Sequence, residues 1–283
     1  MLEDCKEEYD ITENGFVPFK CHNLPEEYQY LKKINNNKEK YSNFREYIKK
    51  YKSGKLEKLE NYKYDEIKTI YSLSSIIVHY YMWYDYFITN SDDNIKITIP
   101  YILSYPFYNS SKIIGIKPVL THAGVNLWNW KFKDNNLGFE LENLECKYIM
   151  CKDIEQTESW FFLIMTYLEY RCGKIIYNMD KIYNELEKDK NNKMDETIIL
   201  LNIKIISGIL DEQIKLINNI YKKCDPKEFY NRLRIFLNGS SKLKNGIKLL
   251  DINAINEINI KCKGASAAQS SIIPLEDIFF NIE

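Results

Sequence analysis

A run of very small side chains near the end of the chain offers groups that could contact a ligand. Residues 264–271 read Gly-Ala-Ser-Ala-Ala-Gln-Ser-Ser, in a sequence otherwise rich in Lys, Asn, Ile and Tyr. Small side chains let a backbone approach a ligand or another helix closely, while the serine hydroxyls and the glutamine amide supply hydrogen-bonding groups. The run indicates either a ligand-contacting loop or a plain small-residue loop before a helix.

Arg234 is a candidate anion-binding residue. It lies four residues after Tyr230 and three before Leu237, so the three side chains share one face of a predicted helix. That face is otherwise apolar, and an unpaired buried charge is costly, so we expect Arg234 to pair with an anion. The anion is either a bound ligand or a Glu or Asp of the chain itself.

Four other side chains could either be structural or contact a ligand: Phe161, Phe162, Met165 and His122. Phe161 and Phe162 lie in an apolar helical stretch, where such a pair usually packs in the core, and Met165 shares the face of Phe161 one turn later. His122 is a lone histidine, and such a residue is usually hydrogen-bonded and structural. We identify no catalytic acid or base in the sequence.

Long helices must position these residues. Apolar spacing predicts them over residues 67–84, 160–176 and 196–223. We expect Gly173 to break the second, and the third to be amphipathic and to face a core. Asp225 and Pro226 predict a further helix start, because Asp caps well and Pro suits the first helical position. Gly239 predicts the end of that helix.

The middle of the chain is less regular. Alternation over residues 94–101 predicts a short strand, and residues 134–138 predict a polar turn. We place an approximate domain boundary after that turn. The predicted fold is mainly α, with a small, mostly helical domain over residues 1–145 and a larger all-helical domain over residues 146–283.

Composition narrows the class of protein. The chain has 283 residues, 45% of them hydrophobic, a net charge of -1 and a pI near 6.4, which gives no electrostatic reason to expect nucleic acid or an anionic membrane as partner. Seven cysteines lack the spacing of a zinc site, and we see neither a secretory signal nor an apolar run of membrane-spanning length. We expect a reduced, cytoplasmic protein with free thiols.

Five segments, taken in order, resemble the indoleamine 2,3-dioxygenase family. They are residues 9–28 (Tyr-Asp-Ile, then Gly-Phe-Val-Pro and Asn-Leu-Pro), 99–130 (Ile-Pro-Tyr, then Pro-Val-Leu-Thr-His-Ala and Asn-Trp), 160–169 (Trp-Phe-Phe-Leu, then Glu), 226–239 (Pro-Lys-Glu-Phe-Tyr, then Leu-Arg-Ile-Phe-Leu and Gly) and 264–277 (the small-residue run, then Asp). Each segment alone is weak evidence. Together they cover nearly the whole chain at family-like spacing.

The resemblance implies a function and a set of site residues. It implies oxidative cleavage of the indole ring of L-tryptophan to N-formylkynurenine, in the kynurenine pathway, with haem b iron as cofactor and O₂ as co-substrate. The implied substrate contacts are Phe161, Phe162, Arg234, Ser266, Tyr230 and His122. The implied cofactor contacts are Gly264, Ala265, Ser266, Ala267, Ala268 and Met165. By the same resemblance, Arg234 would hold the substrate carboxylate and Ser266 would line the amine side.

The resemblance also implies a proximal histidine beyond the small-residue run, whereas this sequence ends at Glu283 after an apolar segment without a clear helix stop. We expect none of His22, His79 and His122 to serve as that ligand. A truncated gene model, a degenerate copy and a haem-free protein remain open explanations. The alternative function is a non-catalytic scaffold or small-molecule-binding protein.

We also expect a large exposed apolar surface around the last two helical segments. The residues expected to be exposed are Ile203, Leu210, Ile272, Ile278, Phe279 and Ile282. The protein would be a monomer, as in the family, and prone to aggregate.

Overall fold

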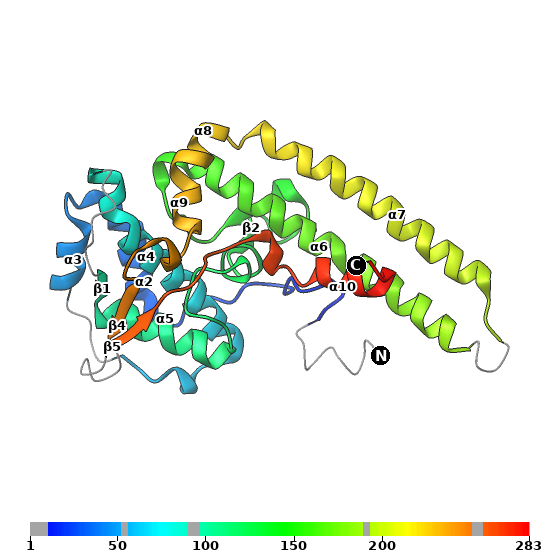
Figure 1. Cartoon of the computed structure of the whole chain (residues 1–283), viewed down its shortest axis with the longest axis horizontal. Coiled ribbons are helices and arrows are strands. Elements are labelled where there is room, and N and C mark those ends of the chain that lie inside the picture. The colour runs from blue at the N-terminus through cyan, green and yellow to red at the C-terminus, as the bar shows by residue number, and fades with distance from the viewer. Residues whose placement is uncertain (1–10, 52–55, 90–96, 189–192, 251–256, 283) are drawn as a thin grey trace.

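The computed structural model describes residues 11–51, 56–89, 97–188, 193–250 and 257–282. The molecule is mainly helical, as predicted, and elongated (Figure 1). One end holds a cluster of helices around a small sheet. A long pair of antiparallel helices, α6 and α7, extends from it toward the other end. Within the described residues, no helix is both long enough and apolar enough to cross a membrane.

Helix α4 (Tyr64–Thr89) is the centre of the first core and contains the helix predicted over residues 67–84. Its side chains from Ile67 to Trp83 are buried on every face. A helix that is buried all round must be covered by other elements. The elements that pack around it are α2 (Gln29–Asn37), α3 (Phe44–Lys50), α5 (Tyr101–Ile114) and α9 (Arg234–Leu237).

A three-stranded sheet joins distant parts of the chain. Strand β1 (Ile97–Ile99) pairs in parallel with β4 (Ile247–Leu250), which pairs antiparallel with β5 (Glu257–Ile260). The strand predicted over residues 94–101 is thus confirmed at its centre; residues 94–96 lie outside the described chain. The proposed division into residues 1–145 and 146–283 stays a prediction.

A second, two-stranded ribbon lies beside α6. It pairs β2 (Trp130–Phe132) antiparallel with β3 (Leu144–Cys146). The predicted polar turn falls between these strands and is confirmed, because the Leu137 amide donates to the Asp134 carbonyl at 3.2 Å. The ribbon places Trp130 in a second core cluster with α6.

Helix α6 (Glu155–Leu186) runs through Gly173, so the predicted break there is wrong. The glycine serves a different purpose. A Cβ atom at Gly173 would lie 2.4 Å from the backbone nitrogen of Gly15, so only glycine allows the N-terminal segment to rest on the helix. The contact fixes the segment around Gly15 against the middle of α6.

Helix α7 (Glu196–Asn218) packs along α6 but buries little of its apolar surface. Ile206 and Ile209 are buried against α6, whereas Leu200 and Ile214 are 65% and 60% exposed. The prediction that its apolar face meets a core is therefore only partly confirmed.

Helix α10 (Ile272–Phe280) packs against the C-terminal half of α6 (Figure 1). The expected exposure is confirmed for Ile278 and Ile282, as it is for Ile203 of α7, while Leu210 and Phe279 are half-buried. It is wrong for Ile272, which is buried in a third core cluster with residues of α6 and α7, including Ile176 and Ile206. The helix also has a stop that the sequence reading missed: Asn281 closes it in a left-handed conformation.

His79 is fully enclosed in the first core and links two segments. Its Nδ1 donates to the Ser75 carbonyl at 3.0 Å, and its Nε2 accepts from the Leu120 amide at 3.3 Å. Both hydrogen bonds fit the neutral ring, and burial lowers the pKa of His79 to about 4. The histidine thereby ties the segment that leads to His122 onto α4.

Replacement of His79 by Gln should weaken the acid sensitivity of the fold. The pKa of His79 is depressed in the folded state, so its contribution to stability is present above about pH 6.5 and lost as the pH falls toward about 4. The free energy of unfolding should therefore fall by about 3 kcal/mol less over this window in His79→Gln than in the parent. His22→Gln, at a half-buried position, is the control. Superimposable pH profiles of the parent and His79→Gln would contradict the prediction.

Candidate functional site

A cavity of about 270 Å³ lies beside Phe161. Its lining comes from α6, the end of α7 and the segment after it: Phe161, Ile217, Ile220, Tyr221, Cys224, Pro226, Phe229 and Tyr230. The ring of Phe161 lies 4.7 Å from that of Phe229 and 5.6 Å from that of Phe162, measured between centroids. The cavity is therefore aromatic and is walled by two of the predicted site residues, Phe161 and Tyr230.

The segment that carries Tyr230 starts as the sequence predicts. The Asp225 carboxylate accepts hydrogen bonds from the Lys227 and Glu228 amides at 2.8 and 3.0 Å, and Pro226 occupies the first turn of α8 (Pro226–Glu228). A wide helical turn over Phe229–Leu233 then leads into α9, which ends before Gly239, whose φ is 66°.

Arg234 shares a face with Tyr230, as predicted, because its guanidinium carbon lies 5.2 Å from the centre of the Tyr230 ring. Both side chains are exposed, Tyr230 to 63%. The argument that Arg234 is a buried charge is therefore wrong for this structure. The guanidinium is stacked on an aromatic ring and is accessible to an anion from solution.

Phe162 and Met165 point toward the interior of the molecule. Phe162 is 1% exposed in the first core cluster, and half-buried Met165 packs with the second. Their predicted roles as substrate and cofactor contacts stay predictions. In the described structure Phe162 packs in the core, whereas Phe161 lines the cavity.

The small-residue run forms a turn before α10. The Ser266 hydroxyl accepts from the Ala268 amide at 3.3 Å, and the Gln269 side chain reaches back to the Ser266 amide at 3.4 Å, which together form a capping box. Ala267 and Ala268 are exposed, and Ala265 is half-buried. This geometry matches the plain interpretation of a small-residue loop that precedes a helix. The predicted cofactor contacts here remain untested.

Gly264 brings this loop against the end of α9. A Cβ atom at Gly264 would lie 1.9 Å from the Leu237 carbonyl oxygen and 2.5 Å from the Gly239 nitrogen. Gly239 also forms a bridge with Lys263. The loop and the Arg234 helix are therefore in backbone contact, which only glycine at position 264 permits.

His122 is buried and both of its ring nitrogens are engaged. Nε2 lies 2.8 Å from Oε1 of Glu169 on α6, and Nδ1 lies 2.9 Å from the Asn126 amide nitrogen. The Asn126 amide nitrogen can only donate, so Nδ1 accepts and Nε2 carries the proton that it donates to Glu169. This matches the structural interpretation of a lone histidine, and its predicted contact with substrate stays a prediction.

Gln269 connects the loop to His122. Its carbonyl oxygen accepts from the His122 amide at 2.8 Å, and its amide nitrogen donates to the Gly264 carbonyl at 3.1 Å. The polar chain Gln269–His122–Glu169 thus ties the small-residue loop to α6. Sequence reasoning missed Asn126 and the bridging role of Gln269. A signal existed for Asn126, which lies four residues after His122 at helical spacing.

The buried histidines do not suit the role of axial ligand to haem iron, because an axial histidine needs a ring nitrogen that is free to bind the metal. His79 and His122 use both ring nitrogens in hydrogen bonds, and the Nε2 atom of His22 lies 3.4 Å from Asp65. Burial raises the pKa of Cys21 to about 11 and that of Cys172 to about 12, which keeps these thiols protonated. No cluster of three or more metal-ligating side chains occurs in the described part of the chain.

Comparison with known proteins identifies the family of the chain. A family profile described as indoleamine 2,3-dioxygenase matches residues 5–283. The chain is 30% identical over 226 residues to an indoleamine 2,3-dioxygenase of Aspergillus nanangensis, covering 75% of this chain and 51% of the relative. It is 25% identical to indoleamine 2,3-dioxygenase 1 of Rattus norvegicus, covering 98% and 66%. It is 29% identical to a 6-hydroxytryptophan 2,3-dioxygenase of Fusarium equiseti, covering 65% and 45%.

The chain belongs to the indoleamine 2,3-dioxygenase family. It spans about half to two thirds of the length of these curated relatives.

A methyl group at Gly264 should displace the loop. In Gly264→Ala, the added carbon meets the Leu237 carbonyl, so we expect the free energy of unfolding to fall by about 3 kcal/mol. Gly208→Ala is the matched control, because its Cβ meets nothing within 4 Å on exposed α7 and should stabilise the helix by about 0.5–1 kcal/mol. Equal stability of the two variants in urea denaturation would show that the loop does not rest on α9.

Loss of the Gln269 amide should release the loop from His122. In Gln269→Leu, the His122 amide loses its acceptor, so we expect a stability loss of about 1–3 kcal/mol and faster hydrogen exchange at the His122 amide. Ser271→Ala, at an exposed position whose side chain caps no helix, is the control and should leave both unchanged. Unchanged exchange at His122 in Gln269→Leu would refute the bridging role.

Proposed function

We propose that this chain is an indoleamine 2,3-dioxygenase-like protein that recognises L-tryptophan or a related indole in the cavity beside Phe161. The family reaction is oxidative cleavage of the indole ring to N-formylkynurenine, with haem and O₂. The names of two relatives support this substrate class, because they are an indoleamine and a 6-hydroxytryptophan 2,3-dioxygenase.

The observation that carries the proposal is the aromatic cavity with a cation at its edge. Phe161 and Phe229 pack against one another, with their ring centres 4.7 Å apart, and together form an apolar aromatic wall of the cavity on which a flat indole could lie. Tyr230 lines the same cavity and carries the Arg234 guanidinium on its ring. A guanidinium donates two parallel hydrogen bonds to a carboxylate, so Arg234 would orient the amino-acid end of the ligand.

The chain's own residues would bind and orient the substrate and exclude water from one face of the indole. The His122–Glu169 pair and Gln269 would hold the loop that carries Ser266 near this region. We derive no oxygen chemistry from the described residues, since their histidines do not fit the role of axial ligand. A reduced, cytoplasmic setting is part of the same proposal.

One alternative function is supported by a specific observation. Because both ring nitrogens of His122 and of His79 are already satisfied, the described scaffold suits a haem-free protein that binds a small molecule. Such a protein would keep the Phe161 cavity and Arg234 and would bind its ligand without redox chemistry.

Two measurements on the purified chain separate these functions. Haemin is added and the absorbance spectrum recorded, and L-tryptophan binding is measured by calorimetry. A stoichiometric five-coordinate haem signal together with tryptophan binding supports the dioxygenase. Tryptophan binding without a haem signal supports the alternative. Absence of tryptophan binding would reject the proposed dioxygenase-like function.

Arg234→Met should remove selectivity for the carboxylate. The parent should bind L-tryptophan about 10-fold or more tightly than tryptamine, which lacks the carboxylate, because one charge-assisted contact is lost. In Arg234→Met the two affinities should converge. Lys227→Met, on the exposed side of α8, should keep the parental preference. Equal affinity of the parent for both ligands would contradict the assignment.

A further inference from the structure

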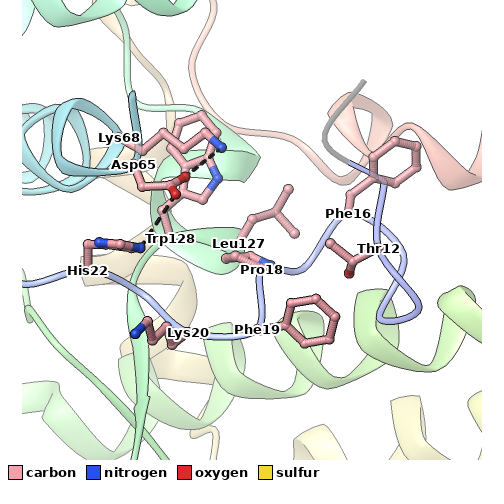
Figure 2. Close-up of a pocket in the computed structure, with 10 residues that line it drawn as sticks. All are labelled: Thr12, Phe16, Pro18, Phe19, Lys20, His22, Asp65, Lys68, Leu127 and Trp128. Atoms are coloured by element: carbon pink, nitrogen blue, oxygen red, sulfur yellow. Dashed lines mark hydrogen bonds and ion pairs between the residues drawn. The ribbon is translucent and has the colours of Figure 1, made fainter. Parts of the chain in front are cut away.

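Two hollows that lie away from Phe161 differ in the state of their charged groups. The first, of about 390 Å³, lies beside the N-terminal segment, and Figure 2 shows Asp65, Lys68 and His22 together at one end of it. Both oxygens of Asp65 are engaged there, one by the Lys68 ammonium at 3.1 Å and the other by Nε2 of His22 at 3.4 Å. The second hollow, between α6 and α10, has a carboxylate that no cation of the described chain neutralises.

The walls of this α6–α10 hollow follow from helical spacing. On each helix the lining side chains repeat at intervals of three and four residues, so each set occupies one face. They are Ile176, Met179, Asp180 and Tyr183 of α6 and Leu275, Ile278 and Phe279 of α10. The two faces enclose a volume of about 220 Å³. An apolar cavity of roughly 150 Å³ can hold benzene, so the hollow has room for an aromatic body.

Helix α10 is held in place without a ligand. Ile272, at its start, is 4% exposed and packs in the third core cluster. Just before it, the Gln269 carbonyl oxygen accepts from the His122 amide at 2.8 Å. The Asn281 amide closes the other end by donating to the Ile278 carbonyl at 3.3 Å. The hollow is therefore preformed, which lowers the cost of ordering on binding.

Asp180 is the only charged residue among the described residues that line the hollow. Its Oδ2 atom accepts from the Asn184 amide nitrogen at 3.0 Å, which is a neutral donor, and within the described chain the carboxylate forms no ion pair. The next residue, Lys181, lies 4.4 Å from the ring centre of Tyr177, which does not line the hollow. A carboxylate is thus available to a cationic ligand at the edge of the hollow.

The apolar walls are unusually exposed for their size. Ile278 is 79% exposed and Tyr183 is 42% exposed, although both border a hollow that an apolar group could fill. A ligand with an apolar body would cover them, and burial of apolar surface is favourable. Tyr183 lies three residues after Asp180 on the same face, and an aromatic ring attracts a cation within about 6 Å of its centre. The ring and the carboxylate can therefore contact one ammonium group.

We propose that the α6–α10 hollow binds a small hydrophobic amine. Its apolar body lies among Met179, Leu275 and Phe279, and its ammonium group lies at Asp180 and Tyr183. Both parts are required, because apolar walls do not attract a small hydrated cation and Asp180 repels an aromatic carboxylate. The site is independent of the proposed dioxygenase function, since it shares no lining residue with the Phe161 cavity.

The test applies three probes of similar shape and different charge to the full chain. They are cationic 2-naphthylmethylamine, uncharged 2-naphthylmethanol and anionic 2-naphthoate, with binding measured by calorimetry. We expect the amine to bind about 10-fold or more tightly than the other two. Asp180→Asn keeps the shape of the side chain and should abolish this preference. Ile278→Ser should weaken the amine and the alcohol by the same factor, because it removes apolar wall without changing charge.

A matched control identifies the carboxylate. Asp211→Asn removes an exposed carboxylate of α7 that does not line the hollow, and it should leave amine binding unchanged. Ile278 is an exposed position, so Ile278→Ser still tests the site if Asp180→Asn is unstable. Equal binding of the amine and the alcohol, preference for 2-naphthoate, absence of binding, or amine binding that neither variant alters would each overturn the proposal. L-Tryptophan binding should be the same in Asp180→Asn as in the parent, which separates this site from the Phe161 cavity.

Discussion

The arrangement of this molecule depends on backbone contacts that only glycine permits. Gly173 on α6 receives Gly15 of the N-terminal segment, and Gly264 receives the carbonyl end of α9 at Leu237 and the backbone of Gly239. Each contact joins segments that are distant in the sequence. The first fixes the N-terminal segment on α6, and the second places the small-residue loop beside the helix that carries Arg234. A single added carbon would force the backbones apart at either place, which is why both sites depend on the absence of side chains.

Buried polar groups provide the second constraint. His79 and His122 both lie in the interior, and each has its ring nitrogens satisfied. An unsatisfied buried group costs more than a satisfied one contributes, so these networks specify positions more than they add stability. His79 fixes the segment before His122, and His122 then holds Gln269 and Glu169 in register. These hydrogen bonds explain how the loop of small residues is held in a fixed position.

Family membership and local geometry answer different questions. The profile match establishes the scaffold, whereas function depends on the individual site. In this chain Phe161 and Phe229 form the aromatic wall of one cavity, and the Arg234 guanidinium lies on the ring of Tyr230, which lines the same cavity. His122 instead serves an internal hydrogen-bond network with Glu169. The apolar surfaces that α7 and α10 leave exposed, including Leu200 and Ile278, are a further feature of the described structure.

The sequence by itself determined the helical class, the long apolar helix over residues 67–84, the start at Asp225 and the stop at Gly239, because these depend on local periodicity and capping. It also predicted that Tyr230 and Arg234 share a face, which follows from helical spacing. Only the tertiary structure decided burial. It left Arg234 exposed and buried Ile272, because exposure depends on which distant segment covers a face. Gly173 is the clearest case: local propensity predicts a break, yet the residue continues the helix because another backbone needs the space that a side chain would fill.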